Sequence, residues 1–348
     1  MPSLPPTAEA LVLRGLLALP PTAQRALVRR PVVLDGQRLS TETQLMLQLE
    51  KVAGVPVVEE LPLAEGRREL VHQAQLVGGR QPIGALRDLV VDGAAGELPA
   101  RLYVPTSRLG ADLVPTMLFL HGGGWVYGDL ESHDAACRFL AERSGVQVLA
   151  VDYRRAPEHP LPAAVEDARA AYRWLVKNAH VVDADPDRLA VGGDSAGGNL
   201  AALVALEAAA HGLPLHFQLL VYPATDFSQR RRSRELFGEG FFLTDRFMVQ
   251  CQDWYLTEGH DRRDPLASVL LTEPFPHDVA TAHVVTAGFD PLRDEGEAYA
   301  DLLAAHGAPV TRTRCTSMIH GFFNIVGVGR EARAANREIA AAVASAMQ

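Results

Sequence analysis

Cysteine is scarce in this sequence of 348 residues: only Cys137, Cys251 and Cys315 occur, far apart and odd in number. A disulfide framework, as in small secreted proteins, is therefore not expected, and small buried thiols in a reduced, cytoplasmic protein are the simpler interpretation. The chain has no Lys or Arg before Arg14, and this residue interrupts the apolar stretch 11–19, so a secretory signal is not expected either.

Long hydrophobic runs are also missing. A membrane-spanning helix needs about 20 consecutive, mostly apolar residues. Residues 113–128 form a charge-free stretch, but Pro115, His121 and the glycines at 122–124 interrupt its apolar character. We therefore expect no membrane span.

Basic residues are fewer than acidic ones: the 33 Lys and Arg and the 42 Asp and Glu give a formal net charge of −9. Such a surface repels phosphate backbones, so nucleic acid is not an expected partner. The one basic run, residues 230–234, is followed by Glu235 and Glu239, which offset its positive charge, and it is interpreted as a solvated loop. Neither an HExxH motif nor paired cysteines occur, so no metal site and no cofactor is expected.

What is present is the composition of a soluble globular protein, with 48% hydrophobic residues, 22% charged residues and a mean hydropathy of +0.02. Before about residue 80, short segments have the apolar spacing of helices. After it, apolar runs of strand length alternate with stretches of helical length, which favours an α/β fold with a mostly parallel sheet covered on both faces. The expected helices are residues 8–19, 23–29, 41–52, 162–178 and 198–211, and the expected strands are residues 96–104, 116–120, 146–151, 189–191, 217–221, 284–287 and 310–314.

The alternation breaks between residues 224 and 264. A polar, arginine-rich entry precedes Phe241, Phe242, Leu243 and a helical stretch at 244–255, and the whole is longer than a simple connection needs. We interpret about residues 225–264 as an insertion that lies over the functional site.

The segment Gly193-Asp194-Ser195-Ala196-Gly197 follows an expected strand and precedes an expected helix. A serine on such a sharp turn projects its hydroxyl into a cleft, and small neighbours at 193 and 197 let the flanking backbones approach. The helix N-terminus adds a dipole that favours developing negative charge. The alternative is a serine that caps the helix, with glycines that serve only the turn geometry.

The segment His121-Gly122-Gly123-Gly124-Trp125 follows another apolar run. Consecutive glycines cost chain entropy, so something should require bare backbone here. An oxyanion hole does, because several N–H groups must point at one place without a Cβ in the way, and Gly123, Gly124 and Ala196 are the expected donors. The alternative is a phosphate-binding or flexible loop, although neither glycine-rich segment fits a nucleotide-binding motif.

A serine hydroxyl needs a base that removes its proton. His320 lies just past the last expected strand, and Asp290 lies just past the strand before it. Because the carboxyl ends of parallel strands face one crevice, Ser195, Asp290 and His320 are expected to meet, in the chain order stated for α/β-hydrolases. The alternatives are a buried structural His320, an Asp290 that caps a helix, and Asp294 as a rival partner of the histidine.

Several segments resemble the hormone-sensitive-lipase-like family of α/β-hydrolases, the bacterial family IV esterases. They are HGGGW at 121–125, DYRRAPEHPLPAAVED at 152–167, GDSAGGNLAA at 193–202, DPLRDEG at 290–296 and HGF at 320–322. The likeness covers about residues 80–346, and Arg155 stands where the family usually has the leucine of YRLAPE. The resemblance implies the α/β-hydrolase fold with an eight-stranded sheet and a helical cap. Residues 1–80 would form the N-terminal cap segment, and residues 81–348 the catalytic domain with its cap insertion.

The family's motifs, carried over residue by residue, imply a nucleophile, a base and an orienting acid, which here are Ser195, His320 and Asp290. The first Asp of the DPLRD stretch is preferred to Asp294 on this ground. The motifs also imply an oxyanion hole formed by the N–H groups of Gly123, Gly124 and Ala196. The expected pocket residues are Trp125, Tyr127, Asp194, Phe241, Phe242, Trp254 and Phe322.

The function that follows is that of a serine carboxylesterase, which hydrolyses small, short- to medium-chain acyl esters through an acyl-enzyme. An amidase, a lactonase or an acyltransferase would use the same apparatus, because fold and triad do not fix the substrate. A receptor without catalysis, like the plant gibberellin receptors that resemble this family but have lost the histidine, is disfavoured by the presence of His320. The resemblance also suggests a homodimer through the sheet edge.

Overall fold

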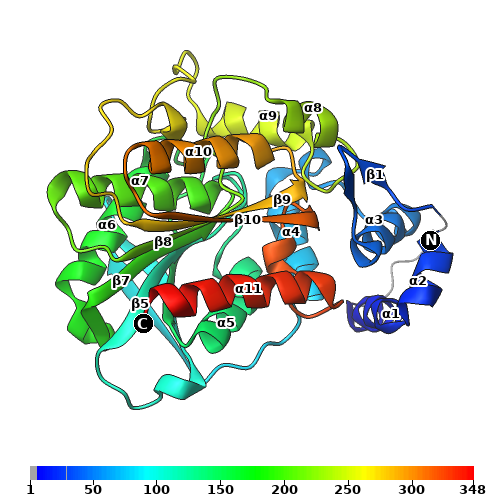
Figure 1. Ribbon diagram of the computed structural model, residues 1–348, viewed down its shortest axis with the longest axis horizontal. Helices are drawn as coiled ribbons and strands as arrows, with labels where there is room; N and C mark the ends of the chain where they lie inside the picture. Colours follow the sequence, from blue (N-terminus) through cyan, green and yellow to red (C-terminus); the bar gives the residue numbers. More distant parts are fainter. Residues whose placement is uncertain (1–5, 29) are drawn as a thin grey trace.

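A single eight-stranded sheet forms the centre of the molecule (Figure 1). The computed structural model describes residues 6–28 and 30–348. The strands lie in the order β10-β9-β8-β7-β5-β6-β4-β3; β4 is antiparallel to both β3 and β6, and the other neighbours run parallel. Their bounds are β3 Ala85–Asp92, β4 Glu97–Val104, β5 Val114–Leu120, β6 Gln147–Val151, β7 Ala184–Asp194, β8 Phe217–Val221, β9 Thr281–Phe289 and β10 Val310–Ile319. The expected α/β fold with a mostly parallel sheet is confirmed.

The central strands are buried on both faces, which is why they occur in the sequence as continuous apolar runs. Every residue of β5, β6 and β8 is buried. Helices α6, α7 and α10 cover one face of the sheet, and α5 and α11 cover the other (Figure 1). These helices span α5 Leu130–Ser144, α6 Ala163–Lys177, α7 Ala196–His211, α10 Arg293–Ala305 and α11 Glu331–Ala346.

Four helices and a small hairpin precede the sheet and lie beyond the carboxyl ends of β9 and β10 (Figure 1). Their bounds are α1 Pro6–Ala18, α2 Pro21–Val28, β1 Val33–Leu34, β2 Gln37–Arg38, α3 Thr41–Ala53 and α4 Leu63–Gly78, with the 3₁₀ turn η1 at Val58–Glu60. The three helices expected in this region are present, although residue 29, at the end of the second, lies outside the described residues. Helix α4 was not expected, because its polar residues obscure the apolar spacing.

The insertion between β8 and β9 contains α8 Arg232–Phe237, α9 Asp245–Tyr255 and the 3₁₀ turn η4 Val269–Leu271. The expected helical stretch at 244–255 is α9, with Thr244 as its N-cap. Further 3₁₀ turns are η2 Thr106–Arg108, η3 Ala179–Val182 and η5 Phe322–Asn324.

The basic run 230–234 is not the solvated loop that its sequence suggested. Its second half belongs to α8, and the side chain of Arg234 is 9% exposed. Its arginines pair with Asp226, Asp245 and Asp35, and not with Glu235 or Glu239. The two glutamates nearest in the sequence are therefore not the partners: Asp226 and Asp245 lie within 15 residues of their arginines, and Asp35 is brought close by the fold.

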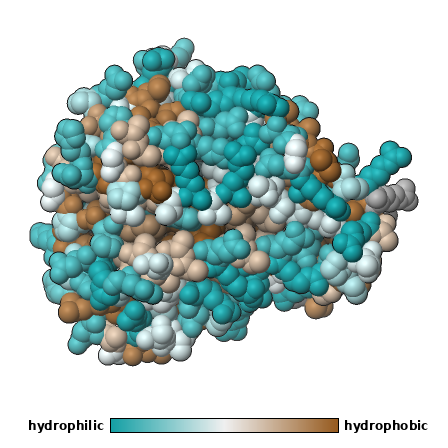
Figure 2. Space-filling model, viewed as in Figure 1, coloured by the Kyte–Doolittle hydropathy of each residue, from teal (hydrophilic) through white to brown (hydrophobic). Residues whose placement is uncertain are grey.

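The surface is mainly hydrophilic on the face shown in Figure 2, where hydrophobic residues occur in small groups. Within the described residues, no helix combines the length and apolar character that crossing a bilayer requires.

Candidate active site

Ser195 lies on a strained turn between β7 and α7. Its backbone has φ 56° and ψ −118°, and α7 begins at the next residue. A Cβ on Gly197 would lie 1.9 Å from the carbonyl oxygen of Leu120, and one on Gly193 would lie 2.3 Å from the oxygen of Gly197. Only glycine fits these positions, because the turn and the end of β5 touch through backbone atoms.

His320 connects Ser195 to Asp290. Its Nε2 lies 2.9 Å from Ser195 Oγ, and its Nδ1 lies 2.8 Å from Asp290 Oδ2. The three residues follow β7, β9 and β10, so the carboxyl ends of these strands deliver them to one place. The structure thus brings the three expected catalytic residues together from positions up to 125 residues apart.

The carboxylate of Asp290 is also held from its other side. Its Oδ1 accepts a hydrogen bond of 2.8 Å from the N–H of Leu292, and its side chain is completely buried. Asp294, the rival acid, instead accepts hydrogen bonds from the N–H of Ser233 and from Arg293. The geometry therefore favours Asp290 as the partner of the histidine.

The loop after β5 supplies the candidate oxyanion donors. Gly123 and Gly124 both have positive φ, 119° and 62°. A Cβ on Gly123 would lie 2.3 Å from the oxygen of Tyr127, so this glycine is required by a close approach as well. Neither N–H group has a hydrogen-bond acceptor among the described residues, and that of Ala196 lies in the first turn of α7, where helices leave N–H groups unpaired.

Asp194 ties this loop to the nucleophile turn. Its Oδ1 accepts a hydrogen bond of 2.9 Å from the N–H of Gly122 and lies 3.1 Å from Nε2 of His133, and its Oδ2 accepts one of 3.3 Å from the hydroxyl of Tyr222. Burial alone would raise the pKa of Asp194, but the His133 ring and the N–H of Gly122 outweigh it and hold that pKa below its usual value. A charged carboxylate therefore lies behind both the serine and the loop.

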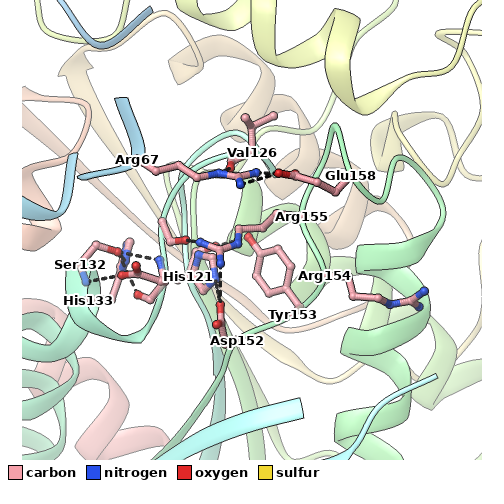
Figure 3. A network of polar contacts seen from close by, with 12 residues as sticks. Arg67, His121, Val126, Ser132, His133, Asp152, Tyr153, Arg154, Arg155 and Glu158 are labelled. Atoms are coloured by element: carbon pink, nitrogen blue, oxygen red, sulfur yellow. Dashed lines mark hydrogen bonds and ion pairs between the residues drawn. The ribbon is translucent and has the colours of Figure 1, made fainter. Parts of the chain in front are cut away.

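Besides Asp194, the ring of His133 contacts Ser132, which orients it. Its Nδ1 lies 2.9 Å from Oγ of Ser132, which in turn donates to the carbonyl oxygen of Asp129 at the start of α5 (Figure 3). The capping box at Asp129 and Ser132 fixes this turn. Sequence analysis missed His133; its place in the first turn of a helix after a glycine-rich loop was the available signal.

A cavity of about 490 Å³ opens next to Ser195 and His320. Three of the seven expected pocket residues line it, namely Trp125, Asp194 and Phe242. The expectation for the other four is corrected, because they are not among the lining residues: Tyr127 stacks on Phe247, Phe241 packs on Phe237 and Phe289, Trp254 lies beside Tyr127, and Phe322 packs edge-on against Tyr222.

The N-terminal helices form a wall of this cavity that the sequence did not reveal. Apolar side chains from α3 and α4 line it together with residues of α9. The residues that sequence reasoning missed include Met46, Leu47, Leu70, Ala74, Val77, Phe227, Phe247, Met248 and Cys251. The helical spacing of α3 and α9 was visible in the sequence, but not what their apolar faces would cover, and α4 was not recognised as a helix.

Two acidic groups in the cavity lining have unusual pKa values. Burial raises the pKa of Glu50 to about 7 and that of Glu295 to about 8. Glu295 Oε1 accepts hydrogen bonds from the N–H groups of Thr225 and Asp226. Among residues 6–28 and 30–348, no group of three His, Cys, Asp or Glu side chains could hold a metal ion.

Comparison with known proteins places this geometry in a family. A model of the α/β hydrolase fold matches residues 117–324. The carboxylic ester hydrolase LipN of Mycobacterium tuberculosis is 42% identical over 93% of this chain and 88% of its own, and an ethyl acetate hydrolase of Pseudomonas putida is 37% identical over 84% and 93%.

Solved structures agree. An ester hydrolase from the metagenome of Lake Arreo, solved in complex with a bipyridine phosphonate derivative, is 40% identical and superposes with a TM-score of 0.83 over 88% of this chain and 98% of its own. A hyperthermophilic esterase of Pyrobaculum calidifontis is 36% identical, with a TM-score of 0.81 over 88% and 98%.

The role of Asp194 can be measured as chemical reactivity of Ser195. Asp194→Asn removes the charge behind the turn and, at Oδ2, the acceptor for the hydroxyl of Tyr222. The hydrogen bonds that Oδ1 accepts then lose their charge assistance, so the glycine loop is held less firmly. We expect the rate constant for phosphonylation of Ser195, followed by intact mass, to fall about tenfold, since small misplacements of reacting groups are costly. Asp187→Asn, on the exposed part of the same strand, is the control. An unchanged rate in Asp194→Asn would contradict this role.

The raised pKa of Glu295 predicts a pH-dependent stability. Between its ordinary value of 4.5 and about 8, the carboxyl ionises in the unfolded chain but not in the folded one, so this group makes folding less favourable as pH rises. Glu295→Gln stays neutral at every pH. Its Tm relative to the unsubstituted protein should therefore increase from about pH 5 to about pH 8.

Glu297→Gln, on the same helix, controls for the loss of a carboxylate, and its Tm difference should stay flat across that range. A flat difference for Glu295→Gln as well would show that the buried carboxyl does not titrate as proposed.

Proposed function

Since the chain belongs to the hormone-sensitive-lipase-like family of α/β-hydrolases, we propose that it hydrolyses short- to medium-chain acyl esters through a covalent acyl-enzyme on Ser195. As a carboxylic ester hydrolase, the enzyme must activate a hydroxyl, stabilise an oxyanion and deliver a proton to the leaving alcohol. The observation that carries the proposal is the continuous contact from Ser195 Oγ through His320 to Asp290.

The acylation half-reaction begins at Ser195. Its Oγ attacks the acyl carbon while Nε2 of His320 takes the hydroxyl proton, and Asp290 holds the ring through Nδ1–H and stabilises the imidazolium. The carbonyl oxygen becomes an oxyanion, for which the N–H groups of Gly123 and Gly124 are the proposed donors, with that of Ala196. The tetrahedral intermediate then collapses, and the alcohol leaves with the proton from His320.

Deacylation repeats these roles with water as the nucleophile. His320 removes a proton from water as it attacks the acyl carbon, and returns that proton to Ser195 Oγ when the acid departs. No other group is required for the proton balance. The contact of His320 with Ser195 also supports catalysis over a binding role alone.

The shape of the cavity supports the proposed substrate size. Its volume of about 490 Å³ lies within the range of small-molecule sites, and its walls are mostly apolar. Because α3, α4 and α9 contribute these walls, we propose that residues 1–80 and the insertion 225–264 together form a cap over the catalytic domain, residues 81–348.

Removal of the nucleophile tests the mechanism. Ser195→Ala should lower the rate of p-nitrophenyl butyrate hydrolysis by about 10³-fold or more, because no other group can form the acyl-enzyme. The serine side chain makes no cap hydrogen bond to α7, so the variant should fold. Circular dichroism and Tm provide that control. Full activity in a folded Ser195→Ala protein would end the proposal.

A substrate series tests the cavity. With p-nitrophenyl esters, kcat/KM should rise from acetate to butyrate or hexanoate, as more apolar area is buried, and fall for palmitate, which exceeds the space. Ala74→Phe fills the cavity from α4 and should penalise the longer esters more than acetate. Ala53→Phe, on an exposed part of α3, is the control. A profile that Ala74→Phe leaves unchanged would contradict the assignment of this wall.

A further inference from the structure

The loop that carries the proposed oxyanion donors, residues 121–128, is strained and has to be held in shape. We call it the oxyanion loop. Trp125 has φ 60°, a left-handed conformation that non-glycine residues seldom adopt and that persists only where surrounding contacts impose it. Inside the loop, the carbonyl oxygen of Gly123 accepts hydrogen bonds of 3.2 and 2.8 Å from the N–H groups of Val126 and Tyr127. The carbonyl groups of Val126 and Gly128 are bonded from outside the loop, each by an arginine.

The first arginine, Arg67, comes from α4 in the N-terminal segment (Figure 3). Its Nε donates to the oxygen of Val126 at 2.9 Å, and its Nη2 donates to the oxygen of Ala156, also at 2.9 Å. The same guanidinium forms a two-pronged ion pair with Glu158, at 2.8 and 2.7 Å. One side chain thus joins α4 to the oxyanion loop and to the segment that follows β6.

Close packing reinforces this junction. A Cβ on Gly66, the residue before Arg67, would lie 3.1 Å from the ring of Tyr127 and 3.0 Å from the oxygen of Val58. Helix α4 therefore touches the oxyanion loop directly. On its other side, the loop meets α9, where a Cβ on Gly124 would lie 2.6 Å from Sγ of Cys251.

The second arginine is Arg155, which stands at the place of the leucine in the YRLAPE pattern that this segment resembles. Its Nη1 donates to the carbonyl oxygen of Gly128, and its Nη2 lies 3.6 Å from Asp152 (Figure 3). Asp152 in turn lies 3.8 Å from Nε2 of His121, the first residue of the oxyanion loop. A leucine could make none of these contacts. The arginine therefore ties the end of the loop back to its beginning.

We propose that Arg67 and Arg155 are positioning residues that clamp the oxyanion loop through the carbonyl groups of Val126 and Gly128, so that docking of α4 is required for a working oxyanion hole. The inference rests on the proposed function. The N-terminal segment then affects catalysis through the hydrogen bond from Arg67 to Val126 and not through the apolar wall alone.

The charges on these partners keep the clamp intact over the working pH range. The Arg67 guanidinium holds the pKa of Glu158 at about 2, so this ion pair persists at any pH near neutrality. Burial alone would raise the pKa of Asp152, but His121 and Arg155 outweigh it and lower that pKa. Both carboxylates are therefore charged wherever His320 would work as a base.

The test separates transition-state stabilisation from substrate binding. Arg67→Ala and Arg155→Leu should each lower kcat for p-nitrophenyl butyrate about tenfold, with KM changed less than twofold, because a loosened donor acts mainly on the oxyanion. Arg68→Ala is the matched control, since Arg68 is the exposed neighbour of Arg67 on the same helix. It should leave both constants unchanged.

A reversible aryl trifluoromethyl ketone provides the second measurement. Ser195 Oγ adds to its carbonyl carbon, the hydroxyl proton passes to His320, and the carbonyl oxygen becomes an oxyanion that requires the same donors. Its Ki should increase by the same factor as kcat falls in Arg67→Ala and Arg155→Leu. The Ki of the corresponding methyl ketone, which binds mainly as the neutral carbonyl, should stay within twofold.

A purely structural role predicts something different. It would lower Tm while leaving kcat and the ketone Ki at their original values well below the Tm, and that outcome would overturn the inference. If Arg67→Ala does not fold, Arg67→Lys serves instead, because an ammonium retains the charge opposite Glu158 but cannot reach both carbonyl groups and the carboxylate in the same fork. The Arg67→Lys variant should show the same loss of kcat, and unchanged kinetics in it would likewise overturn the inference.

A failure of the proposed function can be distinguished from a failure of the arginine clamp. An unsubstituted protein that hydrolyses no ester contradicts that function, but the clamp can still be judged by the rate at which an organophosphonate modifies Ser195. This rate should fall about tenfold in Arg67→Ala and Arg155→Leu relative to Arg68→Ala. Equal rates in all three variants would reject the clamp.

Discussion

The close approach of β5 and β7 at their carboxyl ends is the constraint on which the rest of the site depends. These strands pair in parallel with Leu120 opposite Gly193, and the backbone of the nucleophile turn touches the last carbonyl group of β5. Glycine is the only residue that fits at positions 193 and 197, because any Cβ would overlap backbone atoms of the facing strand or turn. The hydrogen bond from Gly122 to Asp194 then joins the two segments by side chain as well. The turn that carries Ser195 and the oxyanion loop are therefore both fixed to the paired carboxyl ends of β5 and β7.

The proposed catalytic residues could be located from the sequence because each has a local sequence signal. Ser195 lies between a buried strand and a helix, and His320 and Asp290 directly follow the two strands nearest the sheet edge. In a parallel sheet, position along a strand fixes position in space, so three strand ends define a common crevice. The strands buried on both faces were likewise visible as continuous apolar runs, whereas β3, which is mostly exposed, was not predicted.

The cavity walls and the contacts of the pocket residues depend on packing between distant segments, which a sequence pattern does not show. Helix α4 was missed because its charged residues hide its apolar face, yet it forms a cavity wall and carries Arg67. Phe241 and Phe322 were expected to face the substrate, but both pack onto other aromatic side chains. Hydrophobic character predicts burial and cannot distinguish a core from a binding surface. The ion pairs of the α8 arginines with Asp35 and Asp245 could not be predicted from the sequence, because they depend on the fold.

The N-terminal segment and the insertion approach the oxyanion loop from two sides. The elements that line the cavity therefore also contact the loop that carries the proposed oxyanion donors. Gly66 and Arg67 contact the loop from α4, and Cys251 contacts it from α9. In the proposed function, a cap that contacts this loop would both limit substrate size and exclude water from the charges that develop in the reaction. The acidic groups of the cavity fit this description, because burial in apolar surroundings raises the pKa values of Glu50 and Glu295.

The most direct test of the account is a crystal structure of the protein after reaction with an aryl alkylphosphonate, whose tetrahedral adduct mimics the intermediate. We expect a covalent bond from phosphorus to Ser195 Oγ. We also expect a phosphonyl oxygen within about 2.7–3.1 Å of the N–H groups of Gly123, Gly124 and Ala196. An adduct on any other residue, or a phosphonyl oxygen that points away from these three N–H groups, would contradict the proposed mechanism.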